Sequence, residues 1–119
     1  MNVLDSATLE TLRGLQEEGE DDLLSELIDL FLQDAPTRVA HLRQAIECED
    51  WPAVASWAHS LRGSCGSLGA LRMAEVCARL ERHGRDSASR PTAEAIYREL
   101  EGDFALVCAE LRRERNGTH

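Results

Sequence analysis

Apolar residues recur at intervals of three and four positions along almost the whole chain, from Asp5 to Arg113. This is the period of an α-helix that buries one face. No segment alternates apolar and polar β-branched residues between turn residues, as a half-buried strand does. The pattern therefore predicts an all-α protein.

Proline, glycine and capping residues divide the pattern into a short helix followed by longer ones. The short helix is expected over about 5–17, with Leu9, Leu12 and Leu15 on its inner stripe. The next helix begins in the acidic run 20–22 and carries Leu24, Ile28 and Phe31 inward. Pro36 lacks a donor and disfavours helix at Ala35, so we expect a kink or a new start there before apolar positions resume.

Three further helices are expected, over about 52–68, 71–84 and 92–115. Gly84 is suited to a left-handed cap, and the polar stretch 85–91 to a loop. Four longer helices with one apolar stripe each cannot bury those stripes separately. We therefore expect one domain over 2–115, an antiparallel four-helix bundle with a short extra N-terminal helix, and a frayed tail over 116–119.

Composition narrows the possible partners and location. The chain has 119 residues, enough for one domain, and its 22 acidic residues exceed 13 basic ones, all arginine, for a net charge of -9. Such a charge argues against nucleic acid and anionic membranes as partners. No apolar run is long enough to span a bilayer, and the N-terminus lacks a basic region followed by an apolar one, so we expect a cytoplasmic protein.

The four cysteines are widely spaced and form no CxxC pair, so the sequence indicates neither a zinc ribbon nor a redox motif. Reduced and mostly buried thiols are expected, at Cys48, Cys65, Cys77 and Cys108.

One helix carries a face that packing does not explain. At about 100° per residue, one arc of the helix over 52–68 holds the apolar residues Val54, Trp57, Leu61, Cys65 and Leu68. The opposite face holds His59 together with Ala55, Arg62, Gly63 and Gly66. We therefore expect His59 to face solvent.

Glycine inside a helix costs about 1 kcal/mol relative to alanine, so Gly63 and Gly66 suggest another requirement. Without side chains there, another protein's active site could reach the imidazole, and Arg62 could cover negative charge delivered to it. An imidazole in water is largely neutral and nucleophilic near pH 7. The spacing of His59, Gly63 and Gly66 alone has a second explanation. His59 could be an ordinary solvated surface histidine, and the glycines could relieve crowding against a neighbouring helix.

The segment 58–70, AHSLRGSCGSLGA, resembles the signature of the histidine-containing phosphotransfer (HPt) domains of bacterial phosphorelays. That family's pattern runs Ala-His-x-Leu-Lys-Gly, then small residues, then Gly-Ala. The segment 31–36 is similar to the one that precedes the histidine helix in that family, and the likeness spans essentially the whole chain. Arg62 replaces the usual Lys, and Ser67 stands where Asn is frequent.

The resemblance implies that His59 takes a phosphoryl group from a receiver-domain aspartate and passes it to another, with Arg62 contacting the phosphoryl oxygens. It implies a partner surface around Ala55, Arg62, Gly63 and Gly66, and less directly at Thr37 and Arg38. Response-regulator receiver domains and a hybrid sensor histidine kinase are the implied partners. Mg²⁺ would come with the receiver, and this chain would need no cofactor. We expect a monomer, either free-standing or a module of a hybrid kinase.

The chain lacks the nucleotide-binding motifs of a self-sufficient phosphotransferase, so we expect a phosphocarrier. A helical adaptor that binds a kinase or receiver without carrying phosphate is the alternative, and a bundle metalloenzyme would need Glu-x-x-His pairs that are absent. The acidic run 17–22 lacks a calcium-loop pattern. Solvation is expected for His41, helix capping for His83, and packing for Trp51 and Trp57.

Overall fold

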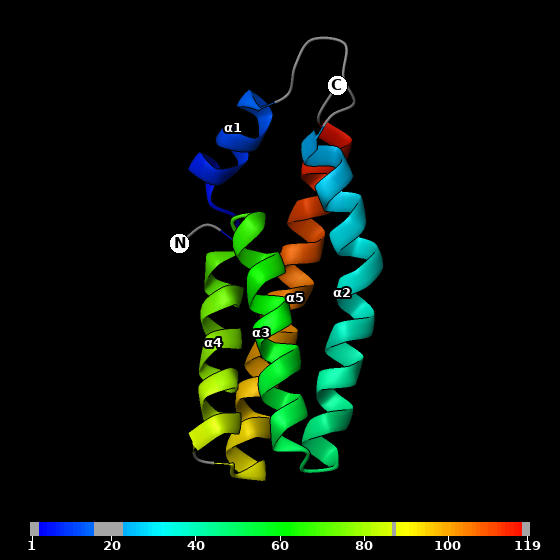
Figure 1. Cartoon of the computed structure of the whole chain (residues 1–119). Coiled ribbons are helices and arrows are strands. Elements are labelled where there is room, and N and C mark those ends of the chain that lie inside the picture. The colour runs from blue at the N-terminus through cyan, green and yellow to red at the C-terminus, as the bar shows by residue number, and fades with distance from the viewer. Residues whose placement is uncertain (1–2, 16–22, 87, 118–119) are drawn as a thin grey trace.

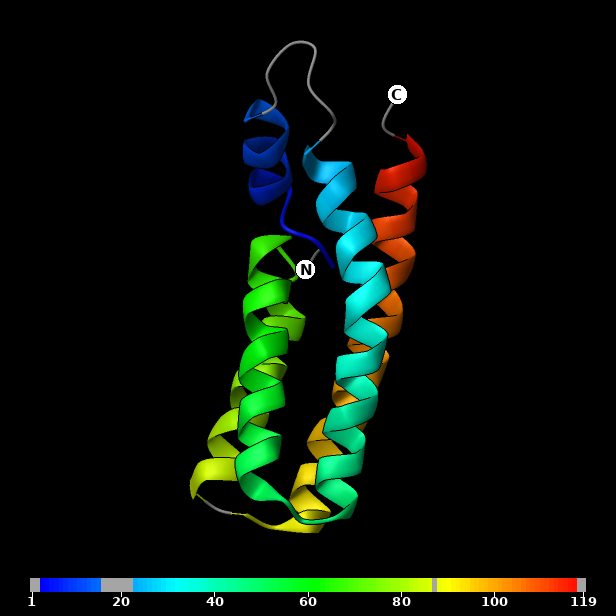
Figure 2. The same ribbon diagram turned by 45° about the vertical axis from the view of Figure 1, so that its right-hand side comes forward.

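The computed structural model describes residues 3–15, 23–86 and 88–117. These residues form no strand, and their helices are α1 (Ser6–Gly14), α2 (Leu23–Glu47), α3 (Trp51–Ser67), α4 (Leu71–Asp86) and α5 (Arg90–Gly117). In Figures 1 and 2, α2 to α5 lie side by side and successive helices run in opposite directions. The predicted antiparallel four-helix bundle with a short extra N-terminal helix is confirmed.

The short helix α1 lies beyond the ends of α3 and α4, beside the longer α2 and α5 (Figure 1). The carboxylate of Asp5 caps α1 by accepting a hydrogen bond from the Thr8 backbone N–H. The Asp5 backbone N–H donates to the Gly69 carbonyl at 2.8 Å, which ties α1 to the α3–α4 turn. Gly69 has φ +77°, and a Cβ there would lie 3.0 Å from Cβ of Thr8, so this turn requires glycine.

The core contains the inward stripes that the helical period predicts. Its fully enclosed side chains come from α2, α3, α4 and α5, and the largest are Leu24, Ile28, Leu42, Leu61, Met73, Leu80, Leu100 and Leu111. The expectation for Leu15 is wrong: α1 ends at Gly14, so Leu15 lies past the inner stripe and is exposed. The helix therefore ends earlier than the end expected near residue 17, and the acidic run 17–22 lies outside the described residues.

Helix α2 runs without a break through Pro36, so the new start allowed by the sequence does not occur. The proline lies on the exposed side of the helix, while Phe31, Ala35 and Val39 continue the buried stripe past it. The helix gives up the hydrogen bond that residue 36 would make to the carbonyl of Leu32, and it keeps the packing of both halves.

Gly84 is not a left-handed cap, and the loop expected over 85–91 is shorter, because α4 continues to Asp86 and α5 already begins at Arg90. A Cβ at Gly84 would lie 3.3 Å from both the Ala55 backbone nitrogen and the Trp51 carbonyl oxygen. Gly84 is therefore a position where α4 approaches the backbone of α3. In the described part of the α4–α5 connection, Ala88 has a left-handed backbone, with φ 45°.

The bundle is elongated, with extents of 49 × 25 × 20 Å. In the ranges that the structure describes, no helix is long and apolar enough to cross a membrane. Helix α5 includes Asn116 and Gly117, two of the residues expected to form a frayed tail, and Thr118 and His119 lie outside the described residues.

Candidate functional site

Helix α3 holds His59 on the outside of the bundle. The Asp50 carboxylate caps the helix by accepting from the Ala53 backbone N–H, and Pro52 suits the first turn. Val54, Ala58 and Leu61 are completely buried on the inner side. This packing fixes the rotation of α3, so the His59 side chain, 60% exposed, faces solvent as predicted.

Gly63 and Gly66 leave the helix surface beside the imidazole open. Both are exposed, and a Cβ at either position would meet no atom within 4 Å outside its own stretch of helix. Crowding against another described helix therefore does not explain them, and that reading of the sequence is wrong. The two glycines lower the helix propensity of α3, and in return they leave the backbone near His59 accessible.

Ala55 does not share this open face. It is 7% exposed because α4 covers it, with Gly84 of α4 close to its backbone nitrogen. The expectation that Ala55 lies on an accessible surface with His59 is therefore wrong. The angular position of Ala55 on α3 could not reveal this, because it does not show which side of α3 is covered by α4.

Arg62 lies one turn after His59, and its guanidinium contacts the ring. Its Nη2 is 3.0 Å from Nδ1 of His59 and 3.6 Å from Oε1 of Glu81. The Arg62 side chain is 44% exposed, so its guanidinium is accessible from solvent.

The sequence reasoning missed Glu81, which α4 places beneath the His59 ring. The Glu81 side chain is 6% exposed, and its Oε2 lies 3.3 Å from Nδ1 of His59 and 2.8 Å from Nη2 of Arg85. Its Oε1 is buried without a hydrogen-bond partner in the described part of the chain. A signal was present, because Glu81 follows Cys77 by one turn on the inward stripe, where a charged residue needs a partner.

Among the described residues, the polar contacts of the His59 ring are therefore all made by its Nδ1 atom. Glu81 and Arg62 both approach that nitrogen, and no described residue makes a hydrogen bond to Nε2. Nε2 is thus the ring nitrogen left for a group that arrives from solvent.

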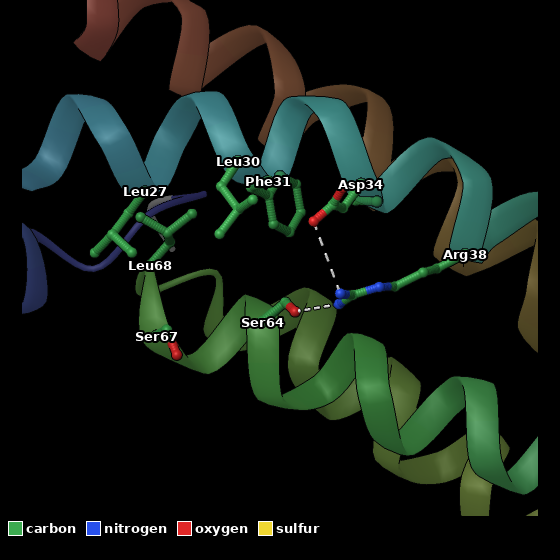
Figure 3. A pocket seen from close by; sticks show the side chains of 9 residues that line it. Leu27, Leu30, Phe31, Asp34, Arg38, Ser64, Ser67 and Leu68 are labelled. Carbon is green, nitrogen blue, oxygen red and sulfur yellow. Dashed lines mark hydrogen bonds and ion pairs between the residues drawn. The ribbon is translucent and has the colours of Figure 1, made fainter.

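A groove of about 130 Å³ lies between α2 and α3 on the side of Ser64 and Ser67 (Figure 3). We call it the α2–α3 groove, and it is lined by Leu27, Leu30, Phe31, Asp34, Ala35, Arg38, Ser64, Ser67 and Leu68. At its polar end Arg38 donates to the Ser64 hydroxyl at 2.7 Å and pairs with Asp34 at 3.9 Å. Of the two α2 residues expected near the site, Arg38 reaches α3, while Thr37 is exposed.

The remaining candidates have structural partners. His41 is exposed and stacks on the half-buried Trp57, with ring centroids 4.8 Å apart. Nε2 of His83 lies 3.0 Å from the backbone nitrogen and 2.8 Å from the carbonyl oxygen of Ser89, so His83 anchors the α4–α5 connection. Trp51 packs edge-on against His83. Over the described ranges, no group of three or more His, Cys, Asp or Glu side chains could hold a metal ion.

The cysteines are free thiols. Cys65, Cys77 and Cys108 are buried, as expected for most of them, and Cys48 is exposed. A hydrogen bond to Cys77 and burial in the core raise the pKa of the Cys65 thiol well above its ordinary value.

Comparison with known proteins decides the family. The model of the Hpt domain family matches residues 26–114, a range that includes His59, Arg62 and Glu81. The chain belongs to the Hpt domain family. Its structure is similar to the crystal structure of histidine-containing phosphotransfer protein B from Pseudomonas aeruginosa, with a TM-score of 0.88 and 29% identity over 98% of this chain and 97% of that one.

This Hpt domain is also similar in sequence to eukaryotic proteins. It is 26% identical to multistep phosphorelay regulator 1 of Schizosaccharomyces pombe over 82% of its own length, and 32% identical to histidine-containing phosphotransfer protein 2 of Arabidopsis thaliana over 56%. The matched regions cover 35% and 44% of those two relatives, so the chain spans less than half of each.

Proposed function

We propose that this Hpt domain is a phosphorelay intermediate. His59 accepts a phosphoryl group from an aspartate of a response-regulator receiver domain and passes it to an aspartate of another receiver. The observation that carries this proposal is the His59 ring itself, which is exposed, has Nε2 without a described hydrogen-bond partner, and lies beside two uncrowded glycines.

The chain supplies part of what phosphoryl transfer needs. Such a reaction requires an in-line nucleophile, neutralisation of the phosphoryl charge and correct positioning. His59 is the nucleophile, and Arg62 neutralises charge through charge-assisted hydrogen bonds to the phosphoryl oxygens. The receiver brings the aspartate and its Mg²⁺, so the chain is a phosphocarrier and not a self-sufficient enzyme.

Arg62 has to leave Nδ1 to make these hydrogen bonds. Its exposure permits this movement, and its planar guanidinium can donate to two phosphoryl oxygens at once. The arginine thereby serves the role that the resemblance assigned to lysine, with a different donor geometry.

The receiver contacts the open surface of Gly63 and Gly66 and extends over the adjoining α2–α3 groove. That groove begins at Ser64 and Ser67 of α3 and ends at the apolar side chains of Leu27 and Leu30, of which Leu30 is 54% exposed. A hybrid sensor histidine kinase that carries such a receiver is the source of the phosphoryl group.

A two-step relay tests this function. A receiver phosphorylated with labelled phosphate is mixed with this chain and Mg²⁺, and a second receiver is then added. We expect label to appear on the chain and then on the second receiver. The His59→Gln variant carries none, while His41→Gln, at an exposed histidine on α2, behaves as wild type. A His59→Gln variant that binds receivers and still supports signalling would favour the adaptor instead.

A further inference from the structure

Arg38 extends from α2 to α3 at the polar end of the α2–α3 groove, where its Nη1 donates to the Ser64 hydroxyl at 2.7 Å (Figure 3). Ser64 directly follows Gly63, so the guanidinium borders the open surface of α3. We propose that Arg38 is a specificity-determining residue, which binds a carboxylate on the surface of the receiver and so selects the receivers that exchange a phosphoryl group with His59. This inference rests on the proposed function of His59.

The guanidinium of Arg38 is held in place before a partner arrives. Ser64 accepts its hydrogen bond, and the Ser64 hydroxyl is itself anchored because it donates to the Ser60 carbonyl at 3.4 Å. The Asp34 carboxylate, one turn earlier on α2, lies 3.9 Å from Nη2 of Arg38. Since these contacts order the side chain in advance, a partner that binds it loses less conformational entropy.

Arg38 keeps hydrogen-bond donors for such a partner. A guanidinium has five N–H groups and no acceptor. Among the described residues, Ser64 alone accepts a hydrogen bond from it, because Asp34 at 3.9 Å is an ion pair beyond hydrogen-bond distance. The Asp34 side chain is 47% exposed, so water screens part of its charge. The remaining donors form a planar fork, which fits a carboxylate from outside the chain.

The position of Arg38 separates its role from that of Arg62. Arg62 contacts the ring of His59, whereas Arg38 is bonded to Ser64, five positions after His59 and roughly 140° further round the helix. Arg38 therefore lies on the side of α3 that faces α2, while the described contacts of the His59 ring lie toward α4. An acceptor that meets Arg38 belongs to the body of the receiver and not to the transferred phosphoryl group.

The surroundings of Arg38 define the surface that fits it. Helix α3 adds no negative charge, because the sequence has no Asp or Glu from Trp51 to Ser67. The groove beyond Arg38 is apolar and is lined there by Leu27, Leu30, Phe31 and Leu68. A receiver that fits therefore presents an apolar patch with an Asp or Glu at its edge. A receiver with Lys or Arg at that edge is repelled, so one contact supplies both affinity and discrimination.

Binding of the unphosphorylated chain to a panel of receiver domains tests the inference, because affinity is measured without transfer of phosphate. For the receivers that the wild type prefers, we expect Arg38→Met to weaken binding about tenfold and to narrow the spread of affinities across the panel. The loss becomes smaller at high salt, since salt screens a contact at the edge of an interface. Arg43→Met, at an exposed arginine of α2 outside the groove, leaves the affinities unchanged.

Ser64→Ala separates recognition by Arg38 from a purely structural role. This variant removes the hydrogen bond between α2 and α3 and keeps the guanidinium, so we expect receiver affinities within about threefold of the wild type. A loss as large as that of Arg38→Met would assign the effect to the link between the helices and overturn the inference. Unchanged affinities of Arg38→Met would overturn it as well.

Loading of His59 gives a second readout. The small donor potassium phosphoramidate presents no protein surface, so we expect it to load Arg38→Met at the wild-type rate. Transfer from a phosphorylated receiver to the same variant shows a higher KM and an unchanged kcat. Slower loading by phosphoramidate would place Arg38 in the chemical step and contradict its role in recognition. A wild type that binds receivers and is not loaded by them would contradict the proposed function and leave the affinity result standing.

Discussion

Gly84 of α4 and Ala55 of α3 approach so closely that a Cβ on Gly84 would lie 3.3 Å from the Ala55 backbone nitrogen. Glu81 is one turn before Gly84 on the same helix. The close approach of the two helices therefore buries Ala55 and brings the Glu81 carboxylate under the His59 ring, so a glycine with no chemical role helps to build the candidate site.

Gly84→Ala is expected to destabilise the chain by about 1 kcal/mol. The added methyl would press on backbone atoms of Trp51 and Ala55, and overpacking of about 1–3 kcal/mol exceeds the gain of about 1 kcal/mol in helix propensity. Urea denaturation measures the change. Gly102→Ala is the control: its Cβ would meet nothing within 4 Å, so the same substitution stabilises α5 by about 0.5–1 kcal/mol. Equal effects at both positions would argue against the close approach.

Gly63→Ala and Gly66→Ala are each expected to raise the free energy of unfolding by about 1 kcal/mol, because both glycines lie in open space on α3. The same variants slow transfer from a phosphorylated receiver, since the methyl groups occupy the surface that a receiver would approach. Loading by potassium phosphoramidate, a much smaller donor, stays at the wild-type rate. Stabilised variants that accept phosphate from receivers at the wild-type rate would remove the glycines from the docking surface.

Leu30→Asp places a charge in the apolar end of the α2–α3 groove. Leu30 is exposed, so the change in stability stays within about 0.5 kcal/mol, while receiver-dependent phosphorylation falls about tenfold. Stopped-flow or quenched-flow transfer assays measure the rate. Leu106→Asp, at an equally exposed leucine of α5 outside the groove, is expected to leave that rate unchanged. A loss of the same size in both variants would indicate a general effect of added negative charge.

The buried thiols make stability fall at alkaline pH. Hydrogen bonding and burial raise the pKa of Cys65, and burial raises that of Cys108. A raised pKa means that the native state holds protons which the unfolded state releases. The contribution of these thiols to the free energy of unfolding is therefore complete below the ordinary thiol pKa near 8.5, and it is lost as the pH rises toward the pKa of the native state. We expect a loss of up to about 1.4 kcal/mol per pH unit for the fully buried Cys65 thiol.

The rate at which a thiol-modifying reagent reacts with each cysteine of the native chain tests whether these thiols are buried. At neutral pH we expect rapid reaction at the exposed Cys48 and slow reaction at the buried thiols, with all four reacting after denaturation. Cys48→Ser removes the rapid phase. Rapid modification of Cys65 in the folded chain would contradict its burial.

The helical period predicted the bundle and the outward direction of His59, because both depend on spacing within a single helix. The uncrowded positions of Gly63 and Gly66 also agree with their place opposite the buried arc. The contact between His59 and Glu81 could not be predicted in this way, since these residues are 22 positions apart and meet through the packing of α3 on α4. Spacing on α3 likewise gave no indication that α4 covers Ala55.

Pro36 and Gly84 show how packing overrides local preference. Each is typical of a helix break, yet α2 and α4 continue through them. In α2 the buried stripe on both sides of Pro36 outweighs one lost hydrogen bond. In α4 the missing side chain of Gly84 allows the contact with α3.

The most direct test of the central claim is the intact mass of this chain after it is mixed with a panel of phosphorylated receiver domains and Mg²⁺, beside the His59→Gln variant. We predict that the wild type gains one phosphate, that acid removes it, and that the variant gains none. A phosphate that survives acid or that also loads the variant would place the acceptor at another residue. If a receiver shown to bind the chain does not load it, the phosphocarrier account is wrong and the adaptor takes its place.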